Sequence, residues 1–190
     1  MSKQEISTEK EKDIQRLVYL IYLYTKKSNF RKEGWLKDQA LKALIYFGIV
    51  KGLFRTFDYA PLFVTWSDQT RFVNVSMEAE AILEKLVKDE ILDRLRLSTE
   101  HYRYIFAYRV RDLSYIEKIP ESIKEEVKRV YQCSKDLVLY EVKFNRYIEP
   151  ILVCPRCDTK IELRVLKTEK MKFMSKIILL SSLMKEYIEV

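Results

Sequence analysis

The residues best suited to chemistry are three cysteines, because the chain of 190 residues contains only one histidine, His101. Cys154 and Cys157 form a Cys-Pro-Arg-Cys turn, which can hold two thiolates about 3 to 4 Å apart, as tetrahedral zinc requires. Cys133 lies upstream, and Asp136 stands three residues after it, where a second such pair would place its fourth ligand. A carboxylate oxygen also binds zinc, so the sequence predicts a metal site formed by Cys133, Asp136, Cys154 and Cys157.

The sequence leaves three interpretations of this group open. The group binds a structural zinc ion, or it has lost the metal and kept its fold, or Cys133 forms a disulfide. His101 is an alternative ligand, although it belongs to a separate polar turn. A redox-catalytic Cys-x-x-Cys is disfavoured, because the strand-to-helix context that lowers a thiol pKa is missing here.

No catalytic group of residues is evident in the sequence, and we expect the protein not to be an enzyme. There is a single histidine, no glycine-rich phosphate loop, and no serine or cysteine in a nucleophile context. The 28 acidic residues lie in a highly charged chain, in which carboxylates come together by chance.

The elements around the cysteines read as a small β module. Residues 137–144, 148–153 and 160–166 have strand-like patterns, and the Cys-Pro-Arg-Cys turn separates the second from the third. This layout is that of a three-stranded zinc ribbon. It follows an amphipathic helix over residues 121–131, which Ile119 and Pro120 separate from the preceding chain.

The central stretch, residues 67–110, reads as two short helices, a turn and a β-hairpin. Ser67 would cap a first helix over residues 68–73, and Ser76 would cap a second, whose apolar residues recur at helical spacing. Residues 91–97 and 102–110 then alternate apolar and polar across a polar turn, which predicts a hairpin. A strand over residues 62–66 would pair with this hairpin. The order predicts a winged helix-turn-helix.

The two ends of the chain are expected to be helical. Residues 2–10 should be frayed, and helices are predicted over residues 12–27 and 34–50. The first is apolar around most of its circumference, so it is either central to the domain or part of a dimer contact. Residues 168–190 read as a terminal helix that packs on the body or pairs with a second copy, making a homodimer.

The predicted fold class is therefore α+β, with a winged helix-turn-helix domain, a small three-stranded zinc-ribbon-like module and a C-terminal helix. The predicted boundaries are residues 1–118, 119–131 as a linker helix, 132–167 and 168–190. Frequent Lys, Glu, Ile and Tyr with only three glycines are typical of proteins from hot environments, which indicates an archaeal source.

The charge distribution bears on the partner. The net charge of +7 divides into +5 for residues 1–60, −1 for residues 61–120 and +3 for residues 121–190, so the basic surplus lies outside the central stretch. The N-terminus lacks a signal peptide, and the apolar runs at residues 17–24 and 177–180 are too short to span a bilayer. We expect a cytoplasmic protein.

The helix and hairpin AEAILEKLVKDEILDRLRL…YRYIFAYRV, followed by CPRC, resemble archaeal winged-helix transcriptional regulators with a zinc-ribbon-like extension, over about residues 62–166. The resemblance implies that the second helix of the motif enters the major groove of DNA and that the wing contacts phosphate. The residues that would contact DNA are Arg71, Lys85, Lys88, Arg94, Arg96 and Arg103.

The charges of the central stretch allow other functions. Glu78, Glu80 and Glu84 lie on the predicted recognition helix, where carboxylates would repel phosphate, so the hairpin is the first place to expect nucleic acid. The wing arginines could instead pair with Asp93 and Glu100 on a solvated strand face. The leading hypothesis is a regulator that binds double-stranded DNA. The alternatives are a protein–protein interaction module, which the acidic helix would suit, and RNA binding through the tyrosine-rich hairpin.

Overall fold

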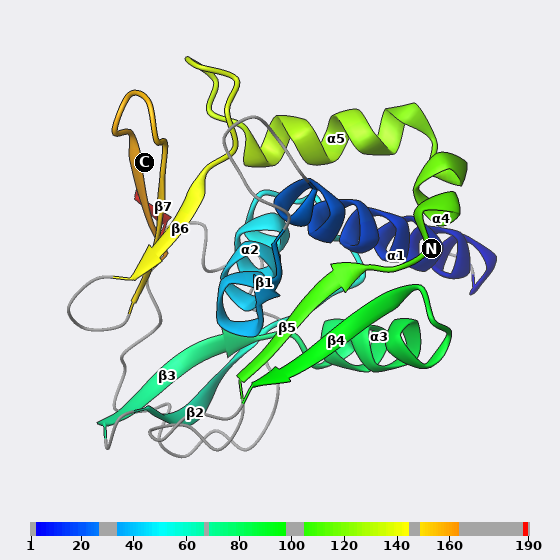
Figure 1. Ribbon diagram of the computed structural model, residues 1–190, viewed down its shortest axis with the longest axis horizontal. Helices are drawn as coiled ribbons and strands as arrows, with labels where there is room; N and C mark the ends of the chain where they lie inside the picture. The colour runs from blue at the N-terminus through cyan, green and yellow to red at the C-terminus, as the bar shows by residue number, and fades with distance from the viewer. Residues whose placement is uncertain are drawn as a thin grey trace.

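The computed structural model describes residues 3–26, 34–66, 69–97, 105–144, 149–163 and 188–189 (Figure 1). The chain is a mixed α+β protein, which confirms the predicted class. Its elements are α1 (Lys3–Thr25), β1 (Leu36–Lys37), α2 (Asp38–Val50), β2 (Ala60–Trp66), β3 (Gln69–Val75), α3 (Met77–Lys88), β4 (Leu92–Leu97), β5 (Ile105–Val110), α4 (Leu113–Lys118), α5 (Glu121–Tyr131), β6 (Glu141–Phe144), β7 (Pro150–Val153), β8 (Lys160–Leu163) and β9 (Ile188–Glu189).

The first part of the chain has winged-helix topology. The order helix, short strand, helix, helix, hairpin is given by α1, β1, α2, α3 and the β4–β5 hairpin, and the sheet order is β1-β5-β4. Leu92 of β4 pairs with Val110, and Leu36 of β1 pairs with Tyr108, both antiparallel. Ser76 caps α3 as expected, because its hydroxyl accepts a hydrogen bond from the Ala79 N–H at 3.3 Å.

The prediction of a helix over residues 68–73 is wrong. Gln69–Val75 is the strand β3, which pairs with β2 along its whole length, from Ala60↔Val75 to Trp66↔Gln69. Its aromatic and β-branched residues suit a strand, and β2 supplies the partner that satisfies its backbone. The first helix of the helix-turn-helix is therefore α2, and the β2–β3 hairpin is inserted between α2 and α3.

The strand expected over residues 62–66 exists but does not pair with the wing. The partner of the wing is β1, which has only two residues and is therefore too short to show an alternating pattern. Because β1 occupies residues 36 and 37, α2 begins at Asp38 rather than at residue 34.

The helix α1 begins at Lys3, so the prediction that residues 2–10 are frayed is wrong for the described part. A buried ion-pair network holds this end of the helix in place. Arg16 Nη1 lies 2.7 Å from a Glu9 carboxylate oxygen and 2.6 Å from Asp13, and Arg16 Nη2 lies 2.8 Å from Glu126 of α5. Asp13 also accepts hydrogen bonds from Thr56 after α2, so the network joins α1, α5 and this loop.

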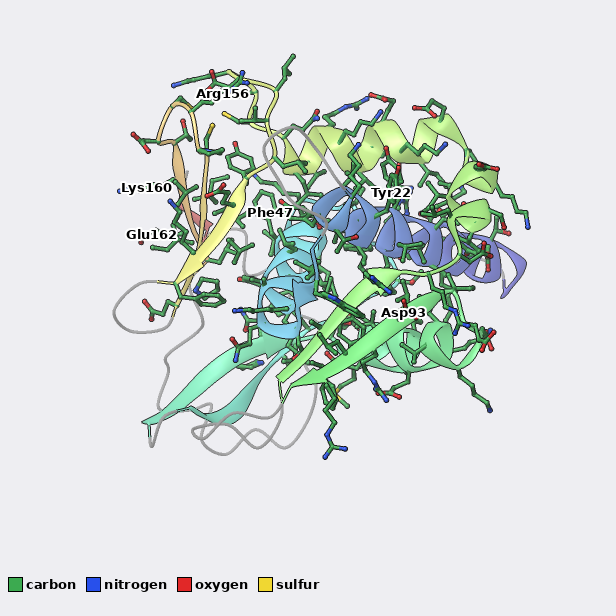
Figure 2. All side chains as sticks on the ribbon, in the orientation of Figure 1. Tyr22, Phe47, Asp93, Arg156, Lys160 and Glu162 are labelled. Carbon is green, nitrogen blue, oxygen red and sulfur yellow. The ribbon has the colours of Figure 1, made fainter. Side chains whose placement is uncertain are left out.

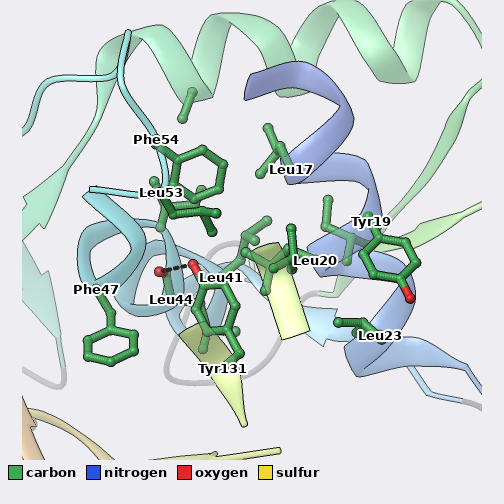
Figure 3. Packing of buried hydrophobic residues seen from close by; sticks show 14 of the residues in the cluster. Leu17, Tyr19, Leu20, Leu23, Leu41, Leu44, Phe47, Leu53, Phe54 and Tyr131 are labelled. Atoms are coloured by element: carbon green, nitrogen blue, oxygen red, sulfur yellow. Dashed lines mark hydrogen bonds between the residues drawn. The ribbon is translucent and has the colours of Figure 1, made fainter. Parts of the chain in front are cut away.

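The hydrophobic core surrounds α1, which contacts α5, α4 and the sheet strands β5 and β1. Of the two positions predicted for this helix, the structure shows the one at the centre of the domain. Leu17, Leu20 and Leu44 are fully buried there (Figure 3). Tyr131 of α5 reaches across the core, and its hydroxyl donates a 2.7 Å hydrogen bond to the carbonyl of Leu44. Gly48 allows this approach, since a Cβ there would lie 2.4 Å from the Tyr131 oxygen.

The three predicted ribbon strands are present as β6, β7 and β8, antiparallel and in that order, but β6 begins at Glu141 rather than at residue 137, and β9 makes the sheet four-stranded. Leu152 and Ile161 of these strands belong to the same hydrophobic cluster as the winged helix. The predicted helix over residues 168–190 is wrong at its end, because Ile188–Glu189 is the strand β9 and pairs with β8. Residues 164–187 lie outside the described part. Among the described residues, no helix is both long and apolar enough to cross a membrane.

Candidate metal centre

The Cys-Pro-Arg-Cys segment after β7 folds into a tight knuckle. The N–H of Cys154 donates to the carbonyl of Thr159 at 2.9 Å, and the N–H of Asp158 donates back to the carbonyl of Cys154 at 3.1 Å. Asp158 has a φ of 55°, which turns the chain into β8. These bonds bring Cys157 back beside Cys154, as the sequence predicted.

The segment after α5 has the same backbone structure, although it lacks a second cysteine. The N–H of Cys133 donates to the carbonyl of Val138 at 2.8 Å, and the N–H of Leu137 donates to the carbonyl of Cys133 at 2.8 Å. Leu137 has a φ of 52°, matching Asp158 in the other knuckle. Asp136 therefore occupies the position that Cys157 occupies in the second knuckle. The two knuckles are therefore equivalent in backbone structure, and the first offers a carboxylate where the second offers a thiol.

The two knuckles face each other and bring the four predicted ligands together. The Sγ atoms of Cys133 and Cys157 lie 3.5 Å apart, and Cys154 Sγ lies 3.6 Å from Asp136 Oδ2. The four ligand atoms all lie within 4.8 Å of one another. Tetrahedral zinc, with Zn–S of about 2.3 Å and Zn–O of about 2.0 to 2.2 Å, requires ligand separations of roughly 3.5 to 3.8 Å. The group is therefore close enough to bind a metal ion.

Backbone N–H groups favour the thiolate form of Cys133, whereas burial opposes the thiolate form. Cys133 and Cys154 are buried, whereas Cys157 is exposed. Backbone N–H groups of Lys135 and Asp136 stabilise the Cys133 thiolate and lower the pKa of Cys133 to about 7. The Cys157 thiol lies 3.0 Å from Thr159 Oγ1, which lowers its pKa, but Asp136, burial and Cys154 together outweigh this and raise the Cys157 pKa to about 11. A divalent ion would favour the thiolate form of every cysteine that it binds.

The geometry also bears on the other interpretations of the cysteines. The separation of 3.5 Å between Cys133 and Cys157 exceeds the length of about 2.05 Å of a disulfide bond, and all three cysteines are free thiols. His101 lies outside the described residues, so the structure does not test its alternative role as a ligand.

Among the residues predicted to contact DNA, Lys85 and Lys88 lie exposed on α3. Neither of them forms an ion pair with another residue of the described part of the chain. Arg94 and Arg96 lie two residues apart on β4 and share one face of the wing, as expected. Arg103 and the side chain of Arg71 lie outside the described residues.

The wing arginines also make contacts within the fold. Arg94 forms an ion pair with Glu84 of α3 and lies over the ring of Phe106, 5.0 Å from its centroid. Asp93, labelled in Figure 2, pairs instead with Arg109 of β5 at 2.9 Å. Asp93 therefore pairs with Arg109, which the predicted alternative did not include, and Arg94 links the wing to α3 through Glu84. Glu100 lies outside the described residues.

The three carboxylates of α3 all have partners that the sequence did not indicate. Glu78 accepts hydrogen bonds from the Ser76 hydroxyl at 3.1 Å and from the Asp58 N–H at 3.4 Å. Glu80 lies 3.5 Å from Lys42 of α2, an ion pair that joins the two helices of the helix-turn-helix. Burial lowers the pKa of Lys42, but Asp38 and Glu80 outweigh it and raise the pKa above its usual value. The contacts from Asp58 and Lys42 follow from no local pattern, because these partners lie 20 or more residues away in the sequence.

The fold and the site together define a class: a winged-helix protein with a ribbon that carries a four-residue candidate metal centre. The chain belongs to the family described as Uncharacterized protein MJ1567 family, whose model matches residues 13–154. That span begins within α1, covers the rest of the winged helix and ends at Cys154 of the second knuckle. No curated protein and no solved structure matches the chain.

Proposed function

We propose that this protein is a DNA-binding regulator whose winged helix contacts double-stranded DNA. Lys85 and Lys88 of α3 and Arg96 of the wing would contact phosphates, with α3 lying toward the major groove. Winged-helix proteins use this helix and the adjacent hairpin in the same way. The +7 net charge of the chain supports association with a polyanion.

The observation that carries this proposal is the state of the charges on α3. Glu80 and Glu84 form ion pairs with Lys42 and Arg94, Lys42 also pairs with Asp38, and Glu78 accepts hydrogen bonds at the start of the helix. The acidic composition of α3 therefore overstates the repulsion that phosphate would meet there. Lys85 and Lys88 are the cations of α3, and neither forms an ion pair among the residues that the structure describes.

A salt series of fluorescence anisotropy with random duplex DNA tests the proposal. Each lost phosphate contact should reduce the slope of log K against log salt by about 0.9, so Lys85→Ala/Lys88→Ala should reduce it by about 1.8. Lys143→Ala is the matched control, because Lys143 lies on β6 of the ribbon, away from α3 (Figure 1). Absence of binding at low salt, or an unchanged slope in the double variant, would contradict the proposal.

A protein partner is the second candidate, and the exposed apolar residues of α3 favour it. Met77 is 48% exposed, and Ala81, one turn further along the helix, is also exposed. If the wild-type protein fails to bind duplex DNA at low salt, this candidate becomes the preferred one. A cross-link from a photoreactive residue at position 81 would then identify the surface that touches α3.

We also propose that the metal centre holds a structural zinc ion. Cys133, Asp136, Cys154 and Cys157 would hold it, and its role would be to join the two knuckles. Four protein ligands would fill all positions of a tetrahedral ion, which is typical of structural sites, whereas catalytic sites keep one position for water or substrate. Native mass spectrometry of protein purified without chelator should show one zinc per chain. A stable, metal-free protein would refute this role.

A further inference from the structure

A cavity of about 480 Å³ lies where the C-terminal ends of α1 and α5 meet the two knuckles. Small-molecule sites in proteins typically have volumes of about 300 to 1,000 Å³ and mostly apolar walls. The apolar lining includes Leu23 from α1, Leu139 after the first knuckle and Pro155 from the second. The winged helix and the ribbon therefore both contribute to one cavity of ligand size.

Leu137, at the edge of this cavity, has two features that lower the stability of the folded protein. It is 72% exposed, and its φ of 52° is a conformation that side chains other than Gly, Asn and Asp rarely adopt. Glycine would fit the same backbone without strain and would expose no apolar side chain. The knuckle itself requires the positive φ at this position, as at Asp158, whereas the exposure of a leucine side chain is not required by it. A ligand that covers Leu137 would recover the free energy of burying that side chain.

The charged residues of the lining indicate the sign of the ligand. Lys26, Lys128 and Arg156 line the cavity with one carboxylate, Glu141. Lys128 pairs with carboxylates of its own helix, and Lys26 lies 5.6 Å from the centroid of the Tyr22 ring. Arg156 projects from the tip of the second knuckle (Figure 2) and forms no ion pair within the described residues. The cavity therefore has an excess of cations beside an apolar wall.

We propose that this cavity binds a small organic anion with an apolar body. The apolar body would lie against Leu137, Leu23 and Pro155, and the anionic group would be attracted by Arg156 and Lys26. The site is distinct from α3, so this inference does not depend on DNA binding. In a winged-helix regulator, such a ligand would act as an effector.

The probe for this site is 8-anilinonaphthalene-1-sulfonate, an apolar aromatic anion whose fluorescence rises on binding. Titration of the full chain should show one saturable site. Decanoate should displace the probe, whereas decyltrimethylammonium, with the same chain length and the opposite charge, should not. Displacement by both amphiphiles to the same extent would overturn the assignment of the anion.

Two variants test the residues of the cavity. Arg156→Glu should weaken probe binding about tenfold or more through charge reversal, and the matched reversal Arg129→Glu, on the exposed face of α5, should leave it unchanged. Leu137→Gly should weaken binding about tenfold while the melting temperature stays the same or rises, because it removes the apolar wall and relieves the backbone. Wild-type affinity in both cavity variants would overturn the proposal, and Arg156→Glu remains informative whatever Leu137→Gly does to folding.

Discussion

Replacing Asp136 by Asn would test whether the first knuckle holds a metal ligand. The two knuckles share their backbone hydrogen bonds and a residue with positive φ, and Asp136 stands where the second knuckle has Cys157. Its Oδ2 atom lies 3.6 Å from Cys154 Sγ, close to the separation of about 3.5 Å expected for oxygen and sulfur ligands of one zinc ion. Asn has almost the same shape and lacks the charge, so the change addresses the ligand and not the packing.

The expected loss follows from the number of ligands. Structural zinc sites bind with about 10 to 16 kcal/mol of apparent free energy, so one of four ligands accounts for roughly 3 kcal/mol, or about 100-fold in Kd. With free zinc in large excess, a 100-fold increase in Kd lowers the free energy of unfolding by about 2.7 kcal/mol. Asp136→Cys, which completes a set of four thiolates, should bind zinc at least as tightly as the wild-type protein.

Competition with a chromophoric zinc chelator measures the affinity, and denaturant unfolding with and without zinc measures the linked stability. The matched control is Asp158→Asn, which removes an equally charged carboxylate at an exposed residue of the second knuckle and leaves all four ligands in place. The reasoning fails if Asp136→Asn keeps wild-type affinity, or if Asp136→Asn and Asp158→Asn weaken zinc binding equally.

Three further predictions concern the packing of α1, α2 and α5. Gly48→Ala should lower the free energy of unfolding by about 1 to 3 kcal/mol in denaturant titrations, because its Cβ would lie 2.4 Å from the Tyr131 oxygen and 2.7 Å from Phe54. Tyr131→Phe should lower the free energy of unfolding by about 1 kcal/mol, because its hydrogen bond to Leu44 is lost. The double variant Gly48→Ala/Tyr131→Phe should lose less than the sum of the two single variants, because removing the oxygen relieves the closest clash. Strict additivity would contradict this geometry. Burial raises the pKa of Glu9, but the hydrogen bond and charge of Arg16 outweigh it, so the pKa lies below 4.5 in the folded protein. The folded pKa is lower than the unfolded one, so this stabilisation is complete above pH 4.5 and is lost as the pH falls further. The difference in unfolding free energy between wild type and Glu9→Gln should therefore shrink below pH 4.5, and a pH-independent difference would show that this ion pair does not contribute.

The inserted hairpin distinguishes this winged helix from the order of elements that its sequence suggests. In the usual motif a short turn joins the two helices, whereas here residues 51–76 carry β2 and β3 between α2 and α3. The ion pair between Lys42 and Glu80 keeps the two helices connected across this insertion. The helix-turn-helix therefore depends on a tertiary contact in place of a short loop.

Where a structure depends on near neighbours, the sequence predicted it. Ser76 caps α3 through the N–H three residues later, the wing follows from alternating residues, and the second knuckle follows from Cys154 and Cys157. The three strands of the ribbon also follow from patterns of adjacent residues. In each case the pattern is carried by adjacent residues, and the strands that pair are consecutive in the chain.

Elements whose stability depends on distant partners could not be predicted in the same way. The strand β1 pairs with β5, which lies about 70 residues further along the chain, and Arg16 of α1 binds Glu126 of α5. Local propensity does not contain these partners. The strand β3 is an exception, because its partner β2 is the preceding strand and its aromatic and β-branched residues already favoured a strand. The other errors fall where tertiary contacts outweigh local preference.

The sequence by itself determined the four ligand types of the metal centre and their spacing within each knuckle. Only the tertiary structure decided that the knuckles are equivalent and face each other, because their meeting depends on α5 and on the pairing of β6 with β7. It likewise decided that Glu80 and Glu84 of α3 are paired, and that Leu137, Arg156 and Lys26 line one cavity. The physical reason is the same in each case, since charge and ligand geometry depend on distances in space that local sequence patterns do not record.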